Sequence, residues 1–433
     1  MPQQSLSVAI IGAGPGGLAL AQGLGKAGIT YRIYDRDLHR EDFMQAFRLS
    51  LRDIGVDALQ ELLNPELYAA FLATSGETSD GAGFYDRDLN LLTPSQGAPT
   101  RDDFTFARAV SRITLRQILL ANIGDRLQTG RIFQAYRERP DGRIDLEFSD
   151  GSTEICDILV GADGVASRVR AQLLPHVRTI DTGARRIAAK VRLTDENRKV
   201  LDPLFLERTI IAKGSRGNNL FISAYNHRHQ DTKGLGSFGG NDSAFERQPG
   251  LLFDNSSSYV MWAFSARADE LPPADVLETL DRRGLFSIAE SAVANWHPAI
   301  QTLVERTDRS TVGLIRIRSS VPFEAWETGA VTLLGDAVHS MTYFRGQGAT
   351  TALHDARLLT RAISAIASGR RQVREALAAY EHEMRMTGFR AVRESMDACE
   401  RALDFRQPEF HQPEFQAGAV PLEPPQLIPA HIS

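Results

Sequence analysis

The residues best suited to chemistry in this chain are glycines and acids that follow short apolar runs. The run Val331–Leu334 ends in Gly335 and Asp336, and Gly346 and Gly348 follow shortly before a helical pattern. A strand that ends in an acid, followed by a glycine-rich turn into a helix, places exposed N–H groups and the positive end of the helix dipole around one pocket. These residues therefore predict a polar ligand that carries negative charge.

The beginning of the chain carries a second glycine turn of this kind. The apolar run Leu6–Ile11 leads into the segment Gly12–Gly17 (GAGPGG), a helical pattern follows, and the next apolar run ends at Asp35. In such a turn the glycines allow tight bending and close approach to a pyrophosphate, and the later acid binds a ribose hydroxyl. The combination predicts dinucleotide binding, with an ordinary glycine-rich turn as the alternative. A third turn, Gly161–Gly164 (GADG), also lies between an apolar run and a helix.

The elements that must position these turns fall into two kinds. An alternating or β-branched pattern predicts a mainly antiparallel sheet from the strands Ile187–Leu193, Arg208–Lys213, Leu220–Tyr225 and Tyr259–Phe264. Before and after it, apolar runs alternate with helical patterns, and two long helices, Thr350–Ala367 and Val373–Arg401, follow the last strand. The simplest organisation is an α/β nucleotide-binding fold that is interrupted by a sheet domain.

The predicted boundaries follow changes in composition along the chain. The segment 76–100 is rich in Gly, Ser, Asp and Pro, which predicts a surface excursion that belongs with the sheet domain. The proline-containing end predicts an extended arm or a disordered tail. The expected units are a nucleotide-binding domain (1–75, 101–177 and 311–368), a sheet domain (76–100 and 178–310), a C-terminal helical region (369–406) and the tail (407–433).

Composition excludes several classes of protein. With 433 residues, 42% of them hydrophobic, and a net charge of −5, the chain gives no reason to expect nucleic acid. Its two cysteines and an N-terminal segment without a basic signal region favour the cytoplasm over a disulfide-stabilised secreted protein. No run of about 18 apolar residues occurs, so no membrane span is expected. No Cys, His and acidic residues share the spacing of metal ligands, so no metal site is predicted.

The order of the three turns resembles the single-component flavoprotein hydroxylases, the FAD monooxygenases similar to para-hydroxybenzoate hydroxylase. The resemblance covers nearly the whole chain except the tail. It implies an α/β fold in which a Rossmann-like FAD-binding domain is interrupted by a substrate domain with a mainly antiparallel sheet, followed by C-terminal helices. It also implies a monooxygenase that uses NAD(P)H and O2 to hydroxylate or epoxidise a small organic substrate through a C4a-hydroperoxyflavin. Because members of this family commonly act on aromatic or polycyclic secondary metabolites, the resemblance also implies a substrate of that kind.

The resemblance further implies which residues bind FAD. The first glycine turn would meet the pyrophosphate, Asp35 the adenosine ribose, and Asp336 the ribityl chain. Arg112 would lie against the ribityl and phosphate region, and Asp163 stands in a motif that serves both FAD and the nicotinamide. The full predicted set is Gly12, Gly14, Pro15, Gly16, Gly17, Asp35, Arg36, Arg112, Asp163, Gly164, Asp336, Gly346, Gly348 and Ala349.

Two positions depart from the family pattern. Tyr343 stands where a proline is usual, and Thr350 stands where an asparagine is usual. We hypothesise that the Tyr343 ring lies by the reactive face of the flavin, where it shapes the substrate pocket and excludes water. The alternative is that it turns outward and packs against Phe344 or the following helix.

Two further residues are candidates for contact with substrate. Arg48 occurs among apolar and small residues of a predicted strand, so it either extends to solvent or points at flavin or substrate. Tyr225 is predicted to line the substrate cavity, with a place in the ordinary sheet core as the alternative. Arg48, Tyr225 and Tyr343 are therefore the predicted catalytic residues. His339 is a candidate base, and a role in stabilising the Gly335-Asp336 turn is an equally good interpretation.

Other functions remain open at this point. An FAD-dependent reductase or dehydrogenase that never uses oxygen, and a non-enzymatic FAD-binding protein, both fit the glycine turns. A flavin-dependent halogenase fits less well, because the chain lacks the tryptophan-rich WxWxIP segment of those enzymes.

Overall fold

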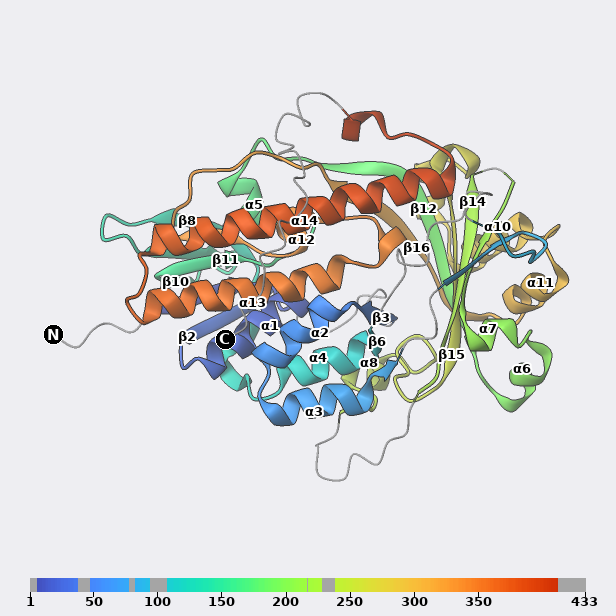
Figure 1. The fold of residues 1–433 in the computed structure, drawn as a ribbon, viewed down its shortest axis with the longest axis horizontal. Coiled ribbons are helices and arrows are strands. Elements are labelled where there is room, and N and C mark those ends of the chain that lie inside the picture. The colour runs from blue at the N-terminus through green and yellow to red at the C-terminus, as the bar shows by residue number, and fades with distance from the viewer. Residues whose placement is uncertain are drawn as a thin grey trace, which may run out of the picture.

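The computed structural model describes residues 6–37, 47–77, 82–93, 107–215, 217–227 and 238–411. A parallel sheet with its helices forms one end of the molecule, and a larger sheet with a separate set of helices forms the other (Figure 1). None of the helices in this described part is long and apolar enough to cross a membrane.

The parallel sheet has five strands in the order β17-β11-β1-β2-β7. The strands are β1 (Ser7–Ile11), β2 (Thr30–Asp35), β7 (Leu127–Thr129), β11 (Ile158–Gly161) and β17 (Val331–Leu333). Strands β1, β11 and β17 are almost wholly buried, as expected for parallel strands covered on both faces. Because β17 joins the sheet only after residue 330, the chain leaves this sheet and returns to it, as the sequence predicted.

Helices cover this sheet, and two small antiparallel sheets extend it. The helices are α1 (Pro15–Lys26), α2 (Asp53–Leu62), α3 (Pro65–Thr74), α4 (Arg112–Leu120), α5 (Arg168–Leu173), α12 (Asp336–His339), α13 (Gly348–Ala367) and α14 (Val373–Leu403). One small sheet contains β3 (Arg48–Leu51), β6 (Arg108–Ser111) and β4 (Gly76–Glu77), and the other contains β8 (Phe133–Glu138), β9 (Ile144–Phe148) and β10 (Thr153–Cys156). The strand predicted around Arg48 is thus observed as β3, which begins at Arg48 itself.

Glycines in α1 permit its close packing against α13. A Cβ added at Gly16 would lie 2.4 Å from the Leu334 side chain and 3.3 Å from that of Ala352. A Cβ at Gly23 would lie 2.5 Å from Thr360 Oγ1. These glycines weaken the isolated helix, but they allow the first glycine turn to sit directly on the last helix of the nucleotide-binding half.

The larger sheet has six strands in the order β16-β12-β15-β14-β13-β5. The strands are β5 (Ala82–Asp86), β12 (Thr179–Arg192), β13 (Thr209–Lys213), β14 (Asn218–Tyr225), β15 (Tyr259–Arg267) and β16 (Asp308–Ser320). All pairs are antiparallel except β13 with β5, so the sheet is mainly antiparallel as predicted.

Two segments of this sheet correct the sequence-based boundaries. Ala82–Asp86, expected in a surface excursion, is an edge strand that pairs with β13, and its Tyr85 is buried in the core of the six-stranded sheet. The residues from 311 to 320, expected in the nucleotide-binding domain, pair with β12 and belong to the six-stranded sheet. Residues 94–100 of the predicted excursion lie outside the described residues.

The two faces of the six-stranded sheet have different neighbours. On the outer face, Ile187, Ile222 and Trp262 pack with apolar residues of the surrounding helices. These helices are α6 (Asp195–Val200), α7 (Leu204–Glu207), α9 (Ala274–Thr279), α10 (Arg282–Ala292) and α11 (Pro298–Glu305). A further short helix, α8 (Ser243–Arg247), lies elsewhere. The inner face points toward the parallel sheet (Figure 1).

The first residues of the predicted tail pack against the fold. Pro408–His411 forms a short 3-10 helix, and Phe410 is buried with Met341 and Val392. Gln407 Nε2 donates a hydrogen bond of 2.8 Å to the Asp181 carbonyl oxygen. Residues 407–411 are therefore not an extended arm, because an aromatic side chain and an amide fix them to the sheet; residues 412–433 lie outside the described part.

Candidate active site

A cavity of about 800 Å³ lies between the parallel sheet and the inner face of the six-stranded sheet. It brings together most of the predicted site residues. Those that line it are Gly14, Pro15, Gly16, Gly17, Arg48, Arg112, Gly164, Tyr225, Asp336, Tyr343, Gly346, Gly348 and Ala349. Gly12, Asp35, Arg36 and Asp163 were also predicted to bind the cofactor, and they are not among the lining residues.

The first glycine turn needs its glycines for two different reasons. Gly12 has a φ of +108°, and a Cβ there would lie 2.3 Å from the Ala162 carbonyl oxygen. Gly14 has ordinary backbone angles, and a Cβ there would meet no protein atom within 4 Å. Gly12 therefore serves the contact between two strand ends, while Gly14 borders the space at the start of α1. An N-terminus with open space before it suits a pyrophosphate.

Two predicted acidic ligands are engaged within the protein. Asp35 Oδ2 accepts a hydrogen bond of 2.5 Å from the Ala13 amide, and its Oδ1 accepts one of 2.8 Å from the Asp37 amide. Asp163 accepts hydrogen bonds from Ser167 Oγ (2.5 Å) and from the Arg168 amide (2.7 Å), so it fixes the start of α5. Both carboxylates thus shape the turns that border the cavity. Arg36 lies beside Asp37, with 70% of its side chain exposed to solvent.

Asp336 begins α12 directly after the third turn, and its accessible side chain borders the cavity. Partial loss of hydration in these surroundings raises the pKa of its carboxyl, although His339 and Arg112 act in the opposite direction. A Cβ added at Gly348, the first residue of α13, would still lie 3.9 Å from Asp336 Oδ1. A carboxylate that borders a cavity beside a helix start with free space suits the hydroxyl groups of a sugar-like chain, which can donate hydrogen bonds to it.

His339 stabilises this turn through Asp355. Its Nε2 lies 2.6 Å from Asp355 Oδ2, and the same oxygen accepts a 3.0 Å hydrogen bond from the Gly335 amide. Burial lowers the pKa of His339, but the Asp355 carboxylate raises it, and the net direction is upward. The structural interpretation of His339 is therefore the one observed. The sequence reasoning missed Asp355, whose only indication was an acid on the buried side of a helix.

Arg48 points into the cavity rather than out to solvent. Its Nη2 donates a hydrogen bond to Ser223 Oγ on β14, so the side chain spans from the small sheet to the six-stranded sheet. Burial lowers the pKa of Arg48, while the nearby Tyr259 and Tyr225 act to raise it. The Tyr225 and Tyr259 rings lie 5.3 Å apart beside it. Arg48 and Tyr225 thus form one polar end of the cavity wall.

Tyr343 lies at the other end of the wall, next to an arginine that the sequence reasoning missed. Its ring is 40% exposed and lies 5.5 Å from the guanidinium of Arg186 on β12. Arg186 Nε donates a hydrogen bond of 2.9 Å to Ser265 Oγ. The doublet Arg185-Arg186 in an apolar strand was the available indication, because adjacent strand residues face opposite sides and one of the two must point inward.

Taken together, the cavity has one side made by backbone turns and one side made by strand side chains. The turn side combines two helix starts, Arg112 and Asp336, which suit a ligand that carries both negative charge and hydroxyl groups. The strand side can hold an organic molecule. Within the described ranges, no group of three or more His, Cys, Asp or Glu side chains could hold a metal ion.

Comparison with known proteins gives concordant results. A sequence model described as an FAD binding domain matches residues 5–57 and 266–395. A crystal structure from Photorhabdus luminescens subsp. laumondii, described as an FAD-containing monooxygenase, is 30% identical with a TM-score of 0.79, and the alignment covers 92% of this chain and 99% of that one. The aurachin C monooxygenase/isomerase of Stigmatella aurantiaca is 28% identical over 83% of this chain and 81% of its own.

A longer relative is similar over nearly all of this chain. The dual O-methyltransferase/FAD-dependent monooxygenase CTB3 of Cercospora beticola is 29% identical over 408 residues, which are 90% of this chain and 45% of that protein. The chain thus spans about half the length of this relative.

Proposed function

This chain belongs to the family of FAD-containing monooxygenases, and from that membership we propose that it uses NAD(P)H and molecular oxygen to hydroxylate or epoxidise a small organic molecule. The observation that carries the proposal is the cavity of about 800 Å³, which joins the three FAD-type turns to the inner face of the six-stranded sheet. FAD, when bound, supplies the transfer of electrons and the activation of oxygen. The protein supplies binding, orientation and exclusion of water.

The turn side of the cavity would hold the cofactor. Backbone N–H groups at the start of α1, with Arg112 close by, would bind the diphosphate. Asp336 would accept hydrogen bonds from the ribityl hydroxyls, and Asp355 would keep its turn in place through Gly335 and His339. The N-terminus of α13 would place positive potential against the electron-rich edge of the flavin ring.

The strand side of the cavity would hold the substrate. We assign substrate contact to Arg48, Tyr225 and Tyr343, which line the same cavity as the glycine turns. The Tyr343 ring is part of the cavity lining and lies against Arg186, which supports the hypothesis that it shapes the pocket. Residues 76–100 and 178–310, extended by β16, would then act as the substrate domain. We also propose a cytoplasmic location, since NAD(P)H is the electron donor.

The test is a turnover experiment with isotope-labelled oxygen. FAD-loaded protein is incubated with NADH or NADPH and a panel of aromatic and polycyclic compounds, and products are analysed by mass spectrometry. We expect at least one compound to accelerate NAD(P)H oxidation and to gain one labelled oxygen atom. A product that forms equally well without oxygen would instead identify a reductase or dehydrogenase. FAD binding without any stimulated NAD(P)H oxidation would argue for the non-enzymatic alternative.

A further inference from the structure

The inner face of the six-stranded sheet is arranged in rows across the strands. Lys213, Asn219, Ser265 and Arg186 are successive partners in the strand register and form one polar row. The next row toward Arg48 consists of Ile211, Phe221, Ala263 and Ala188 and is apolar. Adjacent rows on one face are two residues apart, or roughly 7 Å along the strands. A molecule that lies on the apolar row therefore has one edge beside the polar row, which contains Arg186.

Arg186 reaches this edge with hydrogen-bond donors that have no acidic partner. Its Nε bonds to Ser265, and its guanidinium lies 5.5 Å from the Tyr343 ring and 5.4 Å from the Phe344 ring. No carboxylate of the described residues is within ion-pair distance of it. Burial lowers the pKa of Arg186, as expected for a cation that lacks a neighbouring anion. An arginine remains charged under these conditions, so an anionic group from outside the protein would be strongly favoured.

Asn219 supplies a second, independent indication. Its side chain is only 3% exposed and lines the cavity, and within the described part of the chain its Nδ2 has no hydrogen-bond acceptor. Leaving a buried amide without a partner costs about 1–3 kcal/mol, so such a group is expected to have a partner in the functional state. Asn219 and Arg186 both pair with Ser265 in the register, and the two side chains lie on the same face of the sheet.

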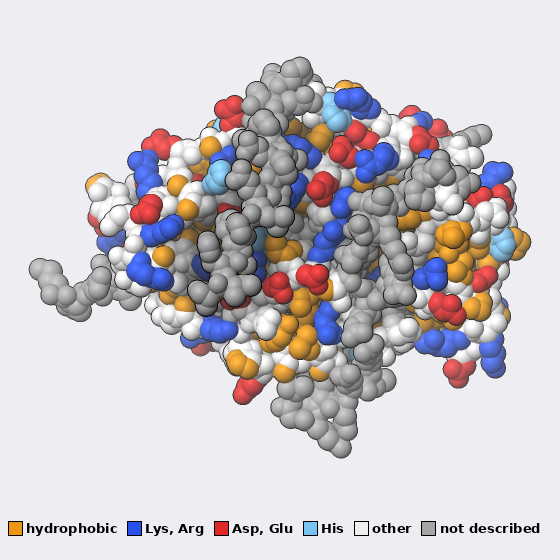
Figure 2. Space-filling model, viewed as in Figure 1, with side chains coloured by type: hydrophobic (Ala, Val, Ile, Leu, Met, Phe, Trp, Pro, Cys, Tyr) orange, Lys and Arg blue, Asp and Glu red, His pale blue; other side chains and the backbone are white. Residues whose placement is uncertain are grey.

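The charge of the cavity agrees with these local observations. Seven arginine and lysine side chains line it, against the two acids Glu207 and Asp336. On the outer surface, by contrast, basic and acidic side chains are interspersed over the face shown in Figure 2. The excess of positive charge is therefore a property of the cavity and not of that surface.

We propose that the substrate carries an ionised oxygen, as a carboxylate or an acidic enol or phenol, which Arg186 and Asn219 bind at the edge of the apolar row. The flat hydrocarbon part of the substrate lies on Phe221, Ala263 and Ala188. This inference rests on the proposed function and names its substrate class. The rival explanation is that Arg186 only supports Tyr343 by stacking on its ring.

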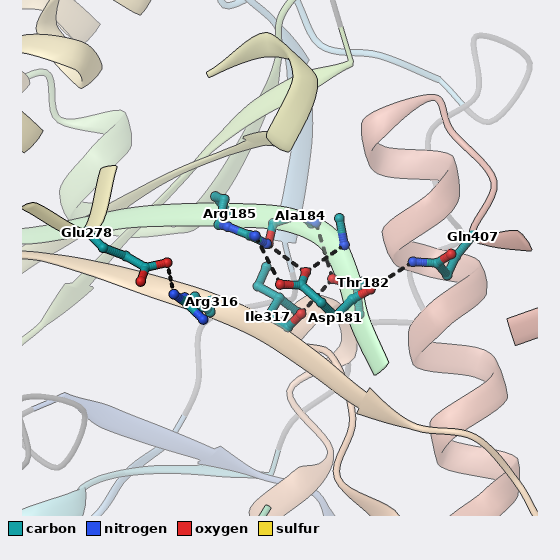
Figure 3. Close-up of polar contacts among 9 residues, drawn as sticks. Asp181, Thr182, Ala184, Arg185, Glu278, Arg316, Ile317 and Gln407 are labelled. Carbon is teal, nitrogen blue, oxygen red and sulfur yellow. Dashed lines mark hydrogen bonds and ion pairs between the residues drawn. The ribbon is translucent and has the colours of Figure 1, made fainter. Parts of the chain in front are cut away.

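The strand bulge before Arg186 provides a matched control. In Figure 3 the Asp181 carboxylate faces Arg185, with hydrogen bonds of 2.7 and 2.9 Å, and Gln407 reaches the same bulge from the C-terminal segment. Arg316, the register partner of Arg185, is paired with Glu278. Arg185 and Arg316 therefore occupy the opposite face from Arg186. Arg316→Gln removes one positive charge from the same sheet without touching the cavity.

The experiment measures binding and not turnover. Equilibrium dialysis of FAD-loaded protein compares 2-naphthoate with 2-naphthamide, and 2-hydroxy-1,4-naphthoquinone with its methyl ether. We expect at least one anion to bind about tenfold or more tightly than its neutral partner, because a hydrogen bond to a charged group contributes about 1.5–3 kcal/mol. The carboxylate pair and the enol pair also distinguish which kind of anion is preferred.

The variants separate the proposal from its rival. Arg186→Gln should remove the preference for the anion, Arg186→Lys should retain part of it, and Arg316→Gln should leave it unchanged. Asn219→Ala should reduce the preference about threefold to tenfold without lowering the thermal stability, since its Nδ2 has no hydrogen-bond acceptor among the described residues. If Arg186 only supports Tyr343, Arg186→Gln will weaken both members of a pair equally.

Two results would overturn the inference: neutral compounds that bind as tightly as the anions in both pairs, or an anion preference that survives in Arg186→Gln. Neither result depends on oxygen insertion. A protein that prefers anions but never incorporates labelled oxygen would refute the proposed monooxygenase function and leave this site standing.

Discussion

The parallel sheet and the six-stranded sheet border the same cavity, but they use different parts of the chain to do so. At the parallel sheet, the lining consists largely of backbone at Gly14, Gly164 and Gly348, each within a short run of consecutive residues. At the six-stranded sheet, the lining consists of side chains such as Arg186, Asn219 and Phe221, which meet only through strand register. The turn side therefore depends on backbone geometry, as at Gly12, where an added Cβ would lie 2.3 Å from the Ala162 carbonyl oxygen, whereas the strand side can change its side chains without a change of fold.

The largest expected effect tests the backbone character of the turn side. Gly12→Ala should prevent formation of a stable FAD-binding protein, because a Cβ would lie 2.3 Å from the Ala162 carbonyl oxygen at a φ of +108°. In the absence of FAD, Gly14→Ala should unfold at the same temperature as the wild type, since a Cβ there meets no protein atom within 4 Å. The same variant should bind FAD more weakly. Thermal unfolding and FAD content measure both. Equal unfolding temperatures for the two variants would break the distinction between the glycines.

The second prediction compares the two faces of the strand side. Ile222→Ala should lower the free energy of unfolding by about 2–5 kcal/mol, because this side chain is fully buried against the outer helices. Its neighbour Phe221 lines the cavity and is only partly buried, so Phe221→Ala should cost less stability and should weaken binding of 2-naphthoate instead. Urea unfolding and dialysis give the two quantities. A larger stability loss for Phe221→Ala would contradict this picture.

FAD binding at the turn side is expected to depend on the Asp336 side chain. Asp336→Ala should weaken FAD binding by about 1.5–3 kcal/mol, the contribution of a hydrogen bond to a charged group. Because partial loss of hydration raises the pKa of Asp336 in the folded protein, its ionised form costs stability once the pH exceeds the ordinary carboxyl value. Asp336→Asn should therefore stabilise the FAD-free protein at neutral pH, and less so as the pH falls. FAD titration and urea unfolding at several pH values test both parts.

His339 should make stability depend on pH in a defined direction. Its pKa is raised in the folded protein by Asp355, despite the opposing effect of burial. The stabilisation is thus fully present below the ordinary histidine value of about 6.5 and is lost as the pH rises through the folded value. His339→Gln should lower stability by about 1–3 kcal/mol at acidic pH and by less at alkaline pH. A difference that grows with pH would reverse the assignment.

The smallest effect on stability, and a specific effect on chemistry, is expected at Tyr343. The side chain is 40% exposed, so Tyr343→Ala should leave unfolding and FAD binding nearly unchanged. It should raise the hydrogen peroxide formed per NAD(P)H consumed, because water would gain access to the cavity. Tyr343→Phe isolates the role of the hydroxyl group. If Tyr343→Ala keeps the wild-type ratio of product to peroxide, Tyr343 does not position the substrate, and Arg48 becomes the better candidate for that role.

The same contrast explains what could be predicted from the sequence. The three turns, the α/β class and the interrupted order were predictable, since each turn is a run of consecutive residues with its own strand and helix. Arg48, Tyr225 and Tyr343 were found as unusual residues in their local context, and all three line the cavity. Arg186 and Asn219 were missed because their roles depend on partners on other strands. Asp355 was missed although its partners His339 and Gly335 are only 16 and 20 residues away, because an acid on the buried side of a helix does not show which group it binds.

The parallel pairing of β5 with β13 was unpredictable for a similar reason. It joins residue 82 to residue 209, and no local pattern indicates that contact. The internal bonds of Asp35 and Asp163 were also missed, because a carboxylate at a strand end has the same sequence pattern whether it binds a ligand or its own turn.

The late return of β17 has a consequence for synthesis on the ribosome. All six strands of the larger sheet are available once residue 320 has emerged, whereas β1, made near the beginning, still lacks β17 and the covering helix α13. The apolar face of α1 that packs near Leu334 and Ala352 therefore waits until more than three hundred residues have been added. The native contacts of α1 with Leu334 and with α13 thus form only after residue 352 has been made. During that interval, chaperones have an exposed hydrophobic helix to protect.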